Sequence, residues 1–562
     1  MQSRNFAIAN LDIEIIANGI GENYASIGEN HGALAYAIQQ ELPFEPRARM
    51  LLPCMDYDVV IIGGAFSGAA TAVVLKRRCP NARVLIVEKN AAFDRKVGES
   101  TTEISSCYMT RILGMTQHLG HHHIAKQGLR MWFSQRREQS FDDCVEVGAR
   151  YGARLSGFQV DRATLDSHML EQAVKASCDL LRPAKVTALQ LDGGEGQTVA
   201  VSFANEDRAI RTRWIVDASG RTALISRMLG YFRPNTEHPI NAVWARFTDT
   251  KDWDSYELRQ KFPDFANACR TSRSWATNHL MGYGWWCWII PLRGGDVSAG
   301  IVYDSRIFEL PPGPNLAQRL HDHLMAHPVG REIFVNAKPI EGDVHAYSAL
   351  AYQSEKVCGN GWAAVGDAAG FIDPLYSPGL DFCSYTSYVV ADLLARSVSG
   401  EDVSSVVDYY NKQYPLMYRG WFESLYKDKY FYLGEADLMS AALLLDVSSY
   451  YVGLVASAYR NPEETFSRLP FEGKPGRIAA AIIKFYNGRL AAIAKRRAAA
   501  GRLGELNASW RELYEGFVPD LSLRKHFTRG LLRWWKAELK NLMLSPRAVQ
   551  TAPSAAANPV EV

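Results

Sequence analysis

Long apolar runs separated by a glycine-rich break form the clearest pattern in the chain. An apolar run over residues 57–62 enters the glycine-rich segment 63–68, and apolar and small residues continue over 69–75. A second apolar run follows over 84–87. Runs of this length and order predict a buried strand, a tight turn, a helix and a second strand. The spacing therefore predicts a βαβ unit.

The turn of this unit predicts a dinucleotide site, because N–H groups at a helix start point at a pyrophosphate and glycine lets the backbone approach it. Glu88, after the second strand, is placed to accept a hydrogen bond from a ribose hydroxyl. Ala65 stands where such turns have their middle glycine, and its methyl group is the smallest possible intrusion. The predicted binding residues of the unit are Gly63, Gly64, Ala65, Phe66, Ser67, Gly68, Glu88 and Lys89.

Other segments supply further groups for the same ligand. Segment 95–101 has a glycine, a carboxylate and hydroxyls at a predicted helix start, which either cap that helix or leave N–H groups facing a ligand. Strand-like stretches over 186–201 and 209–216 lead to an acid, and a later one ends in Gly366-Asp367, as needed where a sheet edge meets a cofactor. A turn at 377–379 opens one more helix, whose first N–H groups face an anion or a flavin ring. These segments add Arg95, Ser100, Thr101, Arg162, Asp217, Gly366, Asp367, Gly379 and Leu380, with surface charge as the alternative for Arg162.

The middle of the chain, about 231–345, alternates apolar and polar residues and is rich in aromatics. This pattern predicts an antiparallel sheet that covers a substrate cavity. Trp286, Trp288 and Ile290 alternate along one strand and share one face, so they wall the cavity or pack in the core.

From residue 396 to 545 the spacing of apolar residues is mostly helical, and the tail 546–562 is rich in Ala and Pro, which predicts disorder. Residues 471–550 hold 16 Lys and Arg against 6 Asp and Glu. Such helices are a solvated basic face, a weak contact with a membrane surface, or a platform for an acidic carrier protein. Residues 1–54 are weakly patterned and are interpreted as an N-terminal extension, which leaves 55–395 as the main module.

Composition narrows the function. Lys plus Arg is 62 against 60 acids, which argues against a nucleic-acid binder. The nine cysteines are scattered without any CxxC, as in reduced cytoplasmic proteins. No apolar run of membrane-spanning length and no signal pattern are found in the sequence, so the expected compartment is the cytoplasm. The histidines at 118 and 121–123 lack a completing carboxylate or thiolate pattern, and no metal site is predicted.

The three segments of glycine and acid together resemble the flavoprotein monooxygenase fold. The string Trp286-x-Trp288-x-Ile290-Pro291 resembles a signature of flavin-dependent halogenases within that fold. Lys126, just before the strand-like run 129–133, occupies the place of that family's essential lysine, although by position alone it reads as a surface residue. The resemblance covers about 55–395 and implies an α/β fold: a Rossmann-like FAD-binding domain, an antiparallel substrate-covering sheet and a helical C-terminal region.

The resemblance also implies an activity. Reduced FAD (FADH2), delivered by a separate NAD(P)H-dependent reductase, and oxygen convert chloride or bromide into hypohalous acid. Lys126 directs that acid onto an electron-rich ring, and desolvation is expected to lower the pKa of the lysine. The halide is expected near Ser377, Pro378, Gly379 and Leu380, and the substrate beside Trp286, Trp288, Ile290, Pro291 and Tyr376.

Two features qualify the resemblance. Tyr376 precedes Ser377, where the tryptophan-specific branch has a glutamate, and this favours phenols, pyrroles or rings bound to an acyl or peptidyl carrier protein. Pro378 has no N–H to offer a halide. An FAD-dependent aromatic hydroxylase or a reductase of the same fold is therefore the alternative, and a non-catalytic, membrane-associated flavin protein is a third possibility.

Overall fold

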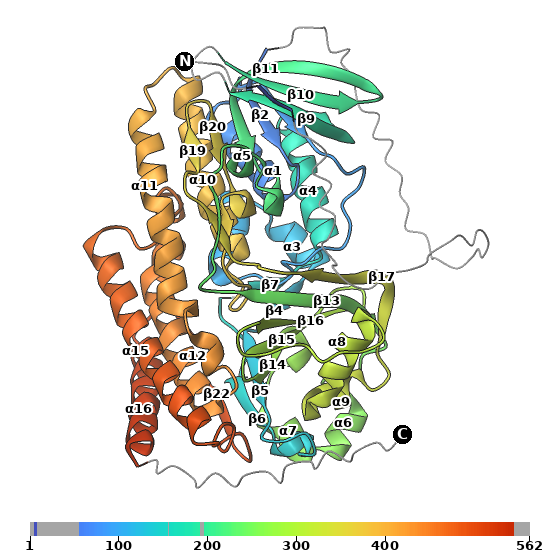
Figure 1. The fold of residues 1–562 in the computed structure, drawn as a ribbon, viewed down its shortest axis with the longest axis vertical. Helices are drawn as coiled ribbons and strands as arrows, with labels where there is room; N and C mark the ends of the chain where they lie inside the picture. The colour runs from blue at the N-terminus through green and yellow to red at the C-terminus, as the bar shows by residue number, and fades with distance from the viewer. Residues whose placement is uncertain (1–4, 8–55, 156, 192–195, 544–562) are drawn as a thin grey trace, which may run out of the picture.

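The computed structural model describes residues 5–7, 56–155, 157–191 and 196–543. Apart from the short strand β1 (Asn5–Ala7), the predicted extension 1–54 lies outside these residues, as does the predicted tail 546–562. The described chain forms two large sheets, one above the other in Figure 1, with long helices along one side, and two small sheets of three and two strands.

The first sheet contains the predicted βαβ unit. Strand β2 (Asp56–Ile62) is parallel to β3 (Val84–Val87), and helix α1 (Phe66–Arg78) connects them. Side chains of β2 alternate between two packed faces, so its residues 59–62 are all apolar: Val59 and Ile61 face the core that holds α1, and Val60 and Ile62 face the other core.

Further parallel strands complete this sheet. Strand β11 is parallel to both β2 and β20, and β8 is parallel to β3. Helices α4 and α10 pack against α1, and the antiparallel strands β9 and β10 extend the sheet beyond β11. The prediction of an α/β fold with a Rossmann-like domain is confirmed. The added elements are β8 (Asp179–Leu181), β9 (Ala184–Leu191), β10 (Gln197–Phe203), β11 (Glu206–Asp217), β20 (Trp362–Ala364), α4 (Arg162–Lys175) and α10 (Gly379–Val398).

The second sheet is the predicted substrate-covering sheet, and most of its pairs are antiparallel. Its range is wider than 231–345, because β5 and β6 come from earlier in the chain and β22 from the C-terminal region. Pairing between strands so distant in sequence leaves no local pattern. The strand order is β17 (Lys338–Tyr347), β13 (Ile240–Thr248), β16 (Val297–Asp304), β15 (Trp285–Pro291), β14 (Thr277–Gly282), β5 (Leu129–Phe133), β6 (Val145–Ala149) and β22 (Arg511–Tyr514).

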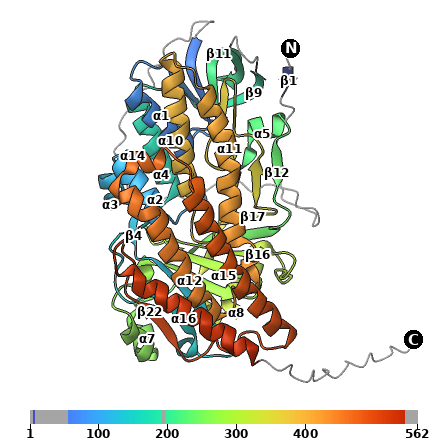
Figure 2. The same cartoon turned by 90° about the vertical axis from the view of Figure 1, so that its left-hand side faces the viewer.

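The C-terminal region is mainly helical, as expected. Its long helices run along one side of the molecule, as Figure 2 shows. They are α11 (Ser404–Trp421), α12 (Ala436–Tyr450), α15 (Gly473–Ala499) and α16 (Leu523–Leu542). This region also supplies β22 to the second sheet, so it packs against the rest of the fold rather than standing apart.

The expectation that no apolar segment has membrane-spanning length was wrong. Within the described residues, Ala436–Arg460 is long and apolar enough to cross a membrane by length and composition, with a mean hydropathy of 1.6. However, 67% of that window is buried inside the protein. Its apolar character is accounted for by packing, since α12 lies between the second sheet and helices α15 and α16.

Candidate active site

The glycine turn after β2 is built for close backbone contact. Gly63 has φ +104°, and a Cβ there would lie 2.4 Å from the carbonyl oxygen of Ala218. A Cβ on Gly68 would lie 2.0 Å from the carbonyl oxygen of Gly63. A side chain is therefore excluded at Gly63 and at Gly68. The first turn of α1 offers the N–H groups of Ser67 and Gly68 to a phosphate, as an FAD pyrophosphate requires. These residues fit the cofactor.

Acidic and basic groups surround this turn. The Glu88 carboxylate accepts hydrogen bonds from the N–H of Gly64 (2.8 Å) and Asn90 (2.9 Å), which holds it beside the turn. Asp166 of α4 accepts a bond from the N–H of Phe66 (3.3 Å) and binds Arg162 (3.1 Å). Arg162 is thus fixed near the start of α1. Lys89 and Arg95 are exposed.

The later glycine-acid segment reaches the same place. Gly366, just after β20, has φ +57°, and a Cβ there would lie 2.4 Å from Oγ of Ser67. The two segments predicted to hold FAD are therefore in contact. Burial raises the pKa of Asp367, while Lys96 and Arg162 lower it. Asp217, in contrast, uses its carboxylate locally, accepting bonds from the N–H of Ser219 (3.0 Å) and Ile225 (2.7 Å).

The predicted halide loop leads into α10. Tyr376 and Ser377 have φ of +68° and +62°, and Pro378 caps the helix without donating a bond. The N–H groups of Asp381 and Phe382 donate to the Pro378 carbonyl (3.0 Å each), so Gly379 and Leu380 supply the remaining amides at the helix start. A small cavity of about 10 Å³ beside Pro378 and Gly379 is also lined by Asp367 and Asp373.

Lys126 is buried at the end of β4 (Ile124–Lys126), with 5% of its surface exposed. Its Nζ donates to Oγ of Ser100 (2.8 Å) and to the Thr101 carbonyl (2.9 Å). Oγ of Ser377 also donates to Oγ of Ser100 (3.0 Å). A chain of polar atoms therefore runs from the predicted halide loop to the lysine. Ser100 and Thr101, predicted as flavin contacts, are placed against Lys126, and a flavin contact stays a prediction for both.

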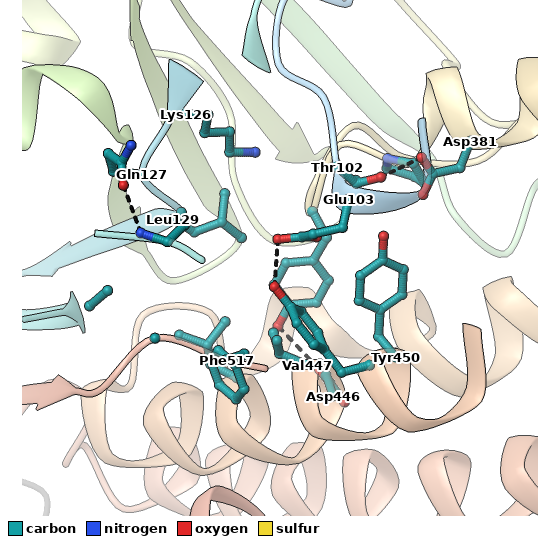
Figure 3. Close-up of a pocket in the computed structure, with 18 of the residues that line it drawn as sticks. Thr102, Glu103, Lys126, Gln127, Leu129, Asp381, Asp446, Val447, Tyr450 and Phe517 are labelled. Carbon is teal, nitrogen blue, oxygen red and sulfur yellow. Dashed lines mark hydrogen bonds between the residues drawn. The ribbon is translucent and has the colours of Figure 1, made fainter. Parts of the chain in front are cut away.

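Burial lowers the pKa of Lys126 to about 8, in the expected direction, while Glu103 and Asp381 act to raise it. A large share of the lysine is therefore neutral at mildly alkaline pH. The lysine also faces a cavity of about 110 Å³, drawn in Figure 3.

Residues from distant parts of the chain enclose this cavity. Tyr376 and Pro378 come from the predicted halide loop, and Pro378 lines the small cavity as well. The other walls are Thr102, Glu103, Gln127, Gly128, Leu129, Ala149, Ala153, Asp381, Trp421, Leu425, Leu443, Asp446, Val447, Tyr450, Tyr451, Tyr514, Gly516 and Phe517. The lining residues from Trp421 onward belong to the C-terminal region, which was not predicted to contribute to the site.

The strand β15, which carries the tryptophans, does not contribute to the cavity beside Lys126. Trp286, Trp288 and Ile290 share one buried face of β15, as predicted, and Nε1 of Trp286 donates to the hydroxyl of Tyr430 (2.9 Å). These three residues and Pro291 do not line the cavity beside Lys126. The geometry brings Tyr376 to the cavity but not the tryptophans, whose contact with substrate stays a prediction.

The histidines form a packed cluster. His118 stacks on His168 with ring centroids 3.8 Å apart, and its Nε2 lies 3.3 Å from Nε2 of His123. Burial lowers the pKa of His118 to about 3 and that of His123 to about 4. No group of three or more potential ligands is found among the residues that the structure describes.

Comparison with known proteins decides the family. The model of the family described as tryptophan halogenase matches residues 136–426, slightly more than half of the chain. The chain belongs to the tryptophan halogenase family. This family is one of flavin-dependent halogenases, which are FAD-dependent oxidoreductases that use a halide. The matched range begins after Lys126 and the glycine turn.

Halogenases are also found among individual relatives. Flavin-dependent halogenase chlA of Dictyostelium discoideum is 25% identical over 430 residues, 70% of this chain and 69% of the relative. A 1H-pyrrole-2-carbonyl-[peptidyl-carrier protein] chlorinase of Pseudomonas fluorescens is 23% identical over 399 residues, 66% of this chain and 82% of the relative. The match spans about two thirds of the length of the first relatives.

The fold is likewise shared with solved structures. The crystal structure of halogenase PltM superposes with a TM-score of 0.68 at 18% identity, covering 86% of this chain and 98% of that one. The same protein in complex with phloroglucinol and FAD gives a TM-score of 0.66. At this identity the likeness establishes the halogenase fold alone.

Proposed function

We propose that this halogenase uses Lys126 to place an electrophilic halogen on an electron-rich aromatic ring bound in the 110 Å³ cavity. One observation carries the proposal: the buried amine faces the cavity and is joined through Ser100 to Ser377 of the predicted halide loop. An amine so placed receives hypohalous acid from one side and a ring from the other.

One set of residues is proposed to hold FAD and the halide, and another set is proposed to hold the aromatic ring. When bound, FAD supplies the oxidising chemistry, and the segments around Gly63–Gly68, Glu88, Arg162 and Gly366-Asp367 are proposed to hold it. The start of α10 offers the N–H groups of Gly379 and Leu380 to a halide. Pro378 lines both cavities and separates the two sides, which limits direct contact between the oxidising centre and the ring.

An aromatic hydroxylase of the same fold is the second candidate. One observation favours it: the carboxylates of Asp367 and Asp373 line the small cavity at the start of α10, and negative groups disfavour a halide. The buried lysine linked to Ser377 favours halogenation, since hydroxylation needs no amine between two cavities.

Turnover in the presence and absence of halide separates the two candidates. The purified chain, FAD, NADH and an added flavin reductase are incubated with a phenol panel in chloride, in bromide and in halide-free buffer, and products are analysed by mass spectrometry. We expect an isotope doublet only when halide is present. Hydroxylated product in all three buffers would establish the alternative.

The separate reductase, a cytoplasmic location and a weak membrane contact complete the proposal. The membrane contact is supported by Phe485 of α15 and by Trp535 and Leu539 of α16, which are exposed on basic helices. Flotation of the full chain with anionic liposomes tests that contact. Sedimentation of all the protein away from lipid would remove it.

A further inference from the structure

Three carboxylates line the cavity beside Lys126, and two of them are held by donors of other structural elements. Asp381 accepts bonds from the hydroxyl of Thr102 and from the N–H of Ser105 (3.1 Å), and so caps helix α2 (Glu103–Cys107). Asp446 accepts bonds from four groups, which are Lys429 Nζ (2.8 Å), Tyr486 OH (2.7 Å), Asn487 Nδ2 (3.0 Å) and Tyr376 OH (3.1 Å). Asp446 therefore has no capacity to spare for a ligand, and the bonds of Asp381 hold its carboxylate against the start of α2.

Glu103 differs from both. It is the first residue of α2, and its side chain points into the cavity in Figure 3. The hydroxyl of Tyr451 donates to its Oε1 (2.9 Å), and Tyr450 also stabilises the charged form. A carboxylate accepts about four hydrogen bonds, so two tyrosines leave room for a donor from a ligand. Burial raises the pKa of Glu103, which makes it a stronger proton acceptor when ionised.

The cavity also limits what that ligand is. Its volume of about 110 Å³ is of the order of the roughly 150 Å³ cavity that admits benzene, which suits a single ring. Lys126 is the only cation among the described residues that line it, against three carboxylates. A substrate carboxylate, or the phosphate of a carrier-protein arm, has no cationic partner there except the amine needed for the chemistry.

We propose that Glu103 binds the phenolic hydroxyl of a free, single-ring substrate lacking a carboxylate, and accepts its proton as the ring is halogenated. The proposal rests on the proposed function and names its substrate class. Tyr451 is a positioning residue, because it acts through the hydrogen bond that holds Glu103.

The step balances with hypohalous acid as the only oxidant. The ring carbon forms a bond to the halogen as the halogen–oxygen bond breaks, and the phenolic proton passes to Glu103. The released hydroxide takes up a proton from the site and leaves as water. The ring then loses its C–H proton, which restores the phenol and the starting protonation. The sum is a phenol and hypohalous acid giving a halophenol and water.

The test compares a donor with its methyl ether. We assay the wild type, Glu103→Gln and Tyr451→Phe with resorcinol and with 1,3-dimethoxybenzene. For each protein, kcat/KM for resorcinol is divided by kcat/KM for the ether. This ratio is then divided by the ratio of the rates at which free hypohalous acid halogenates the same two compounds. We expect the wild type to prefer resorcinol by a further 10- to 100-fold, roughly the contribution of a charged hydrogen bond. Glu103→Gln should lose that preference. Tyr451→Phe should keep most of it but shift the acidic limb of the pH–rate profile.

Further measurements distinguish a failure of the proposed function from a failure of the inference about Glu103. Hypohalous acid is followed by halogenation of a soluble β-diketone trap; its absence in wild type would remove the proposed function itself. Loss of trap halogenation in Glu103→Gln alone would overturn the inference, since it would place Glu103 in halide oxidation. An unchanged resorcinol preference in that variant would also overturn it. The inference would also be overturned if the wild type had a higher kcat/KM for pyrrole-2-carbonyl carrier protein than for resorcinol. A higher kcat/KM for 4-hydroxybenzoate than for 4-methylphenol would overturn it as well.

Discussion

Replacing Gly68 by alanine tests the proposed placement of FAD through one methyl group. The new Cβ would lie 2.0 Å from the Gly63 carbonyl oxygen and 3.1 Å from both Ala218 Cβ and Ile61 Cγ2. A comfortable contact needs about 3.5 Å, so α1 must shift by about 1 Å or more away from the turn. Overpacking of this kind lowers the free energy of unfolding by roughly 1–3 kcal/mol. The same shift moves the N–H groups that face the pyrophosphate.

We therefore expect Gly68→Ala to weaken FAD binding at least tenfold, as each 1.4 kcal/mol is about a factor of ten. Calorimetric titration with FAD and urea unfolding measure the two effects. Gly488→Ala is the matched control: Gly488 is exposed in α15, and nothing lies within 4 Å of an added Cβ. That variant should gain about 0.5–1 kcal/mol of stability and bind FAD normally. Unchanged stability and FAD affinity in Gly68→Ala would show that the pyrophosphate does not bind at this turn.

Three other predictions concern the lysine network. Ser100→Ala removes the hydroxyl between Ser377 and Lys126, so halogenation should fall more than tenfold with unchanged FAD affinity; an unaffected rate would show that Ser100 is not on the route. The halogenation rate should rise as pH approaches 8, because the Lys126 pKa of about 8 sets the neutral fraction, whereas a falling rate would favour a charged hydrogen-bond donor. Finally, Lys126 binds fewer protons in the folded than in the unfolded state between about pH 8 and its ordinary value of 10.5, so the wild type gains stability over that window. Lys126→Met should lack this gain in urea unfolding, and identical pH profiles would contradict the lowered pKa.

The sequence was most informative where the structure depends on neighbours in the chain. The turn at Gly63–Gly68 needs glycine for local reasons of space and φ, and its strand and helix follow directly on either side. The apolar runs of β2 and β3 likewise reflect burial on both faces. These features were therefore predictable residue by residue.

The cavity was not predictable in the same way. Glu103 and Tyr451 meet across 348 positions of sequence, and their contact depends on how α12 packs on the second sheet. Phe517 follows β22, whose pairing with β6 is equally distant. The Trp286 strand shows the converse: alternation predicted its buried face but did not specify whether that face meets a cavity or the core.

The role of Lys126 is tested most directly by the product yield of Lys126→Ala, measured together with its FAD affinity. With bromide, a flavin reductase and a phenol, we expect a loss of halogenated product of about 10²-fold or more, typical of removing a group that acts on the reacting atoms. FAD affinity should match that of the wild type and of Lys175→Ala, an exposed lysine of α4. Retained halogenation, or loss of FAD binding, would contradict the claim that the amine of Lys126 stands between the halide loop and the substrate.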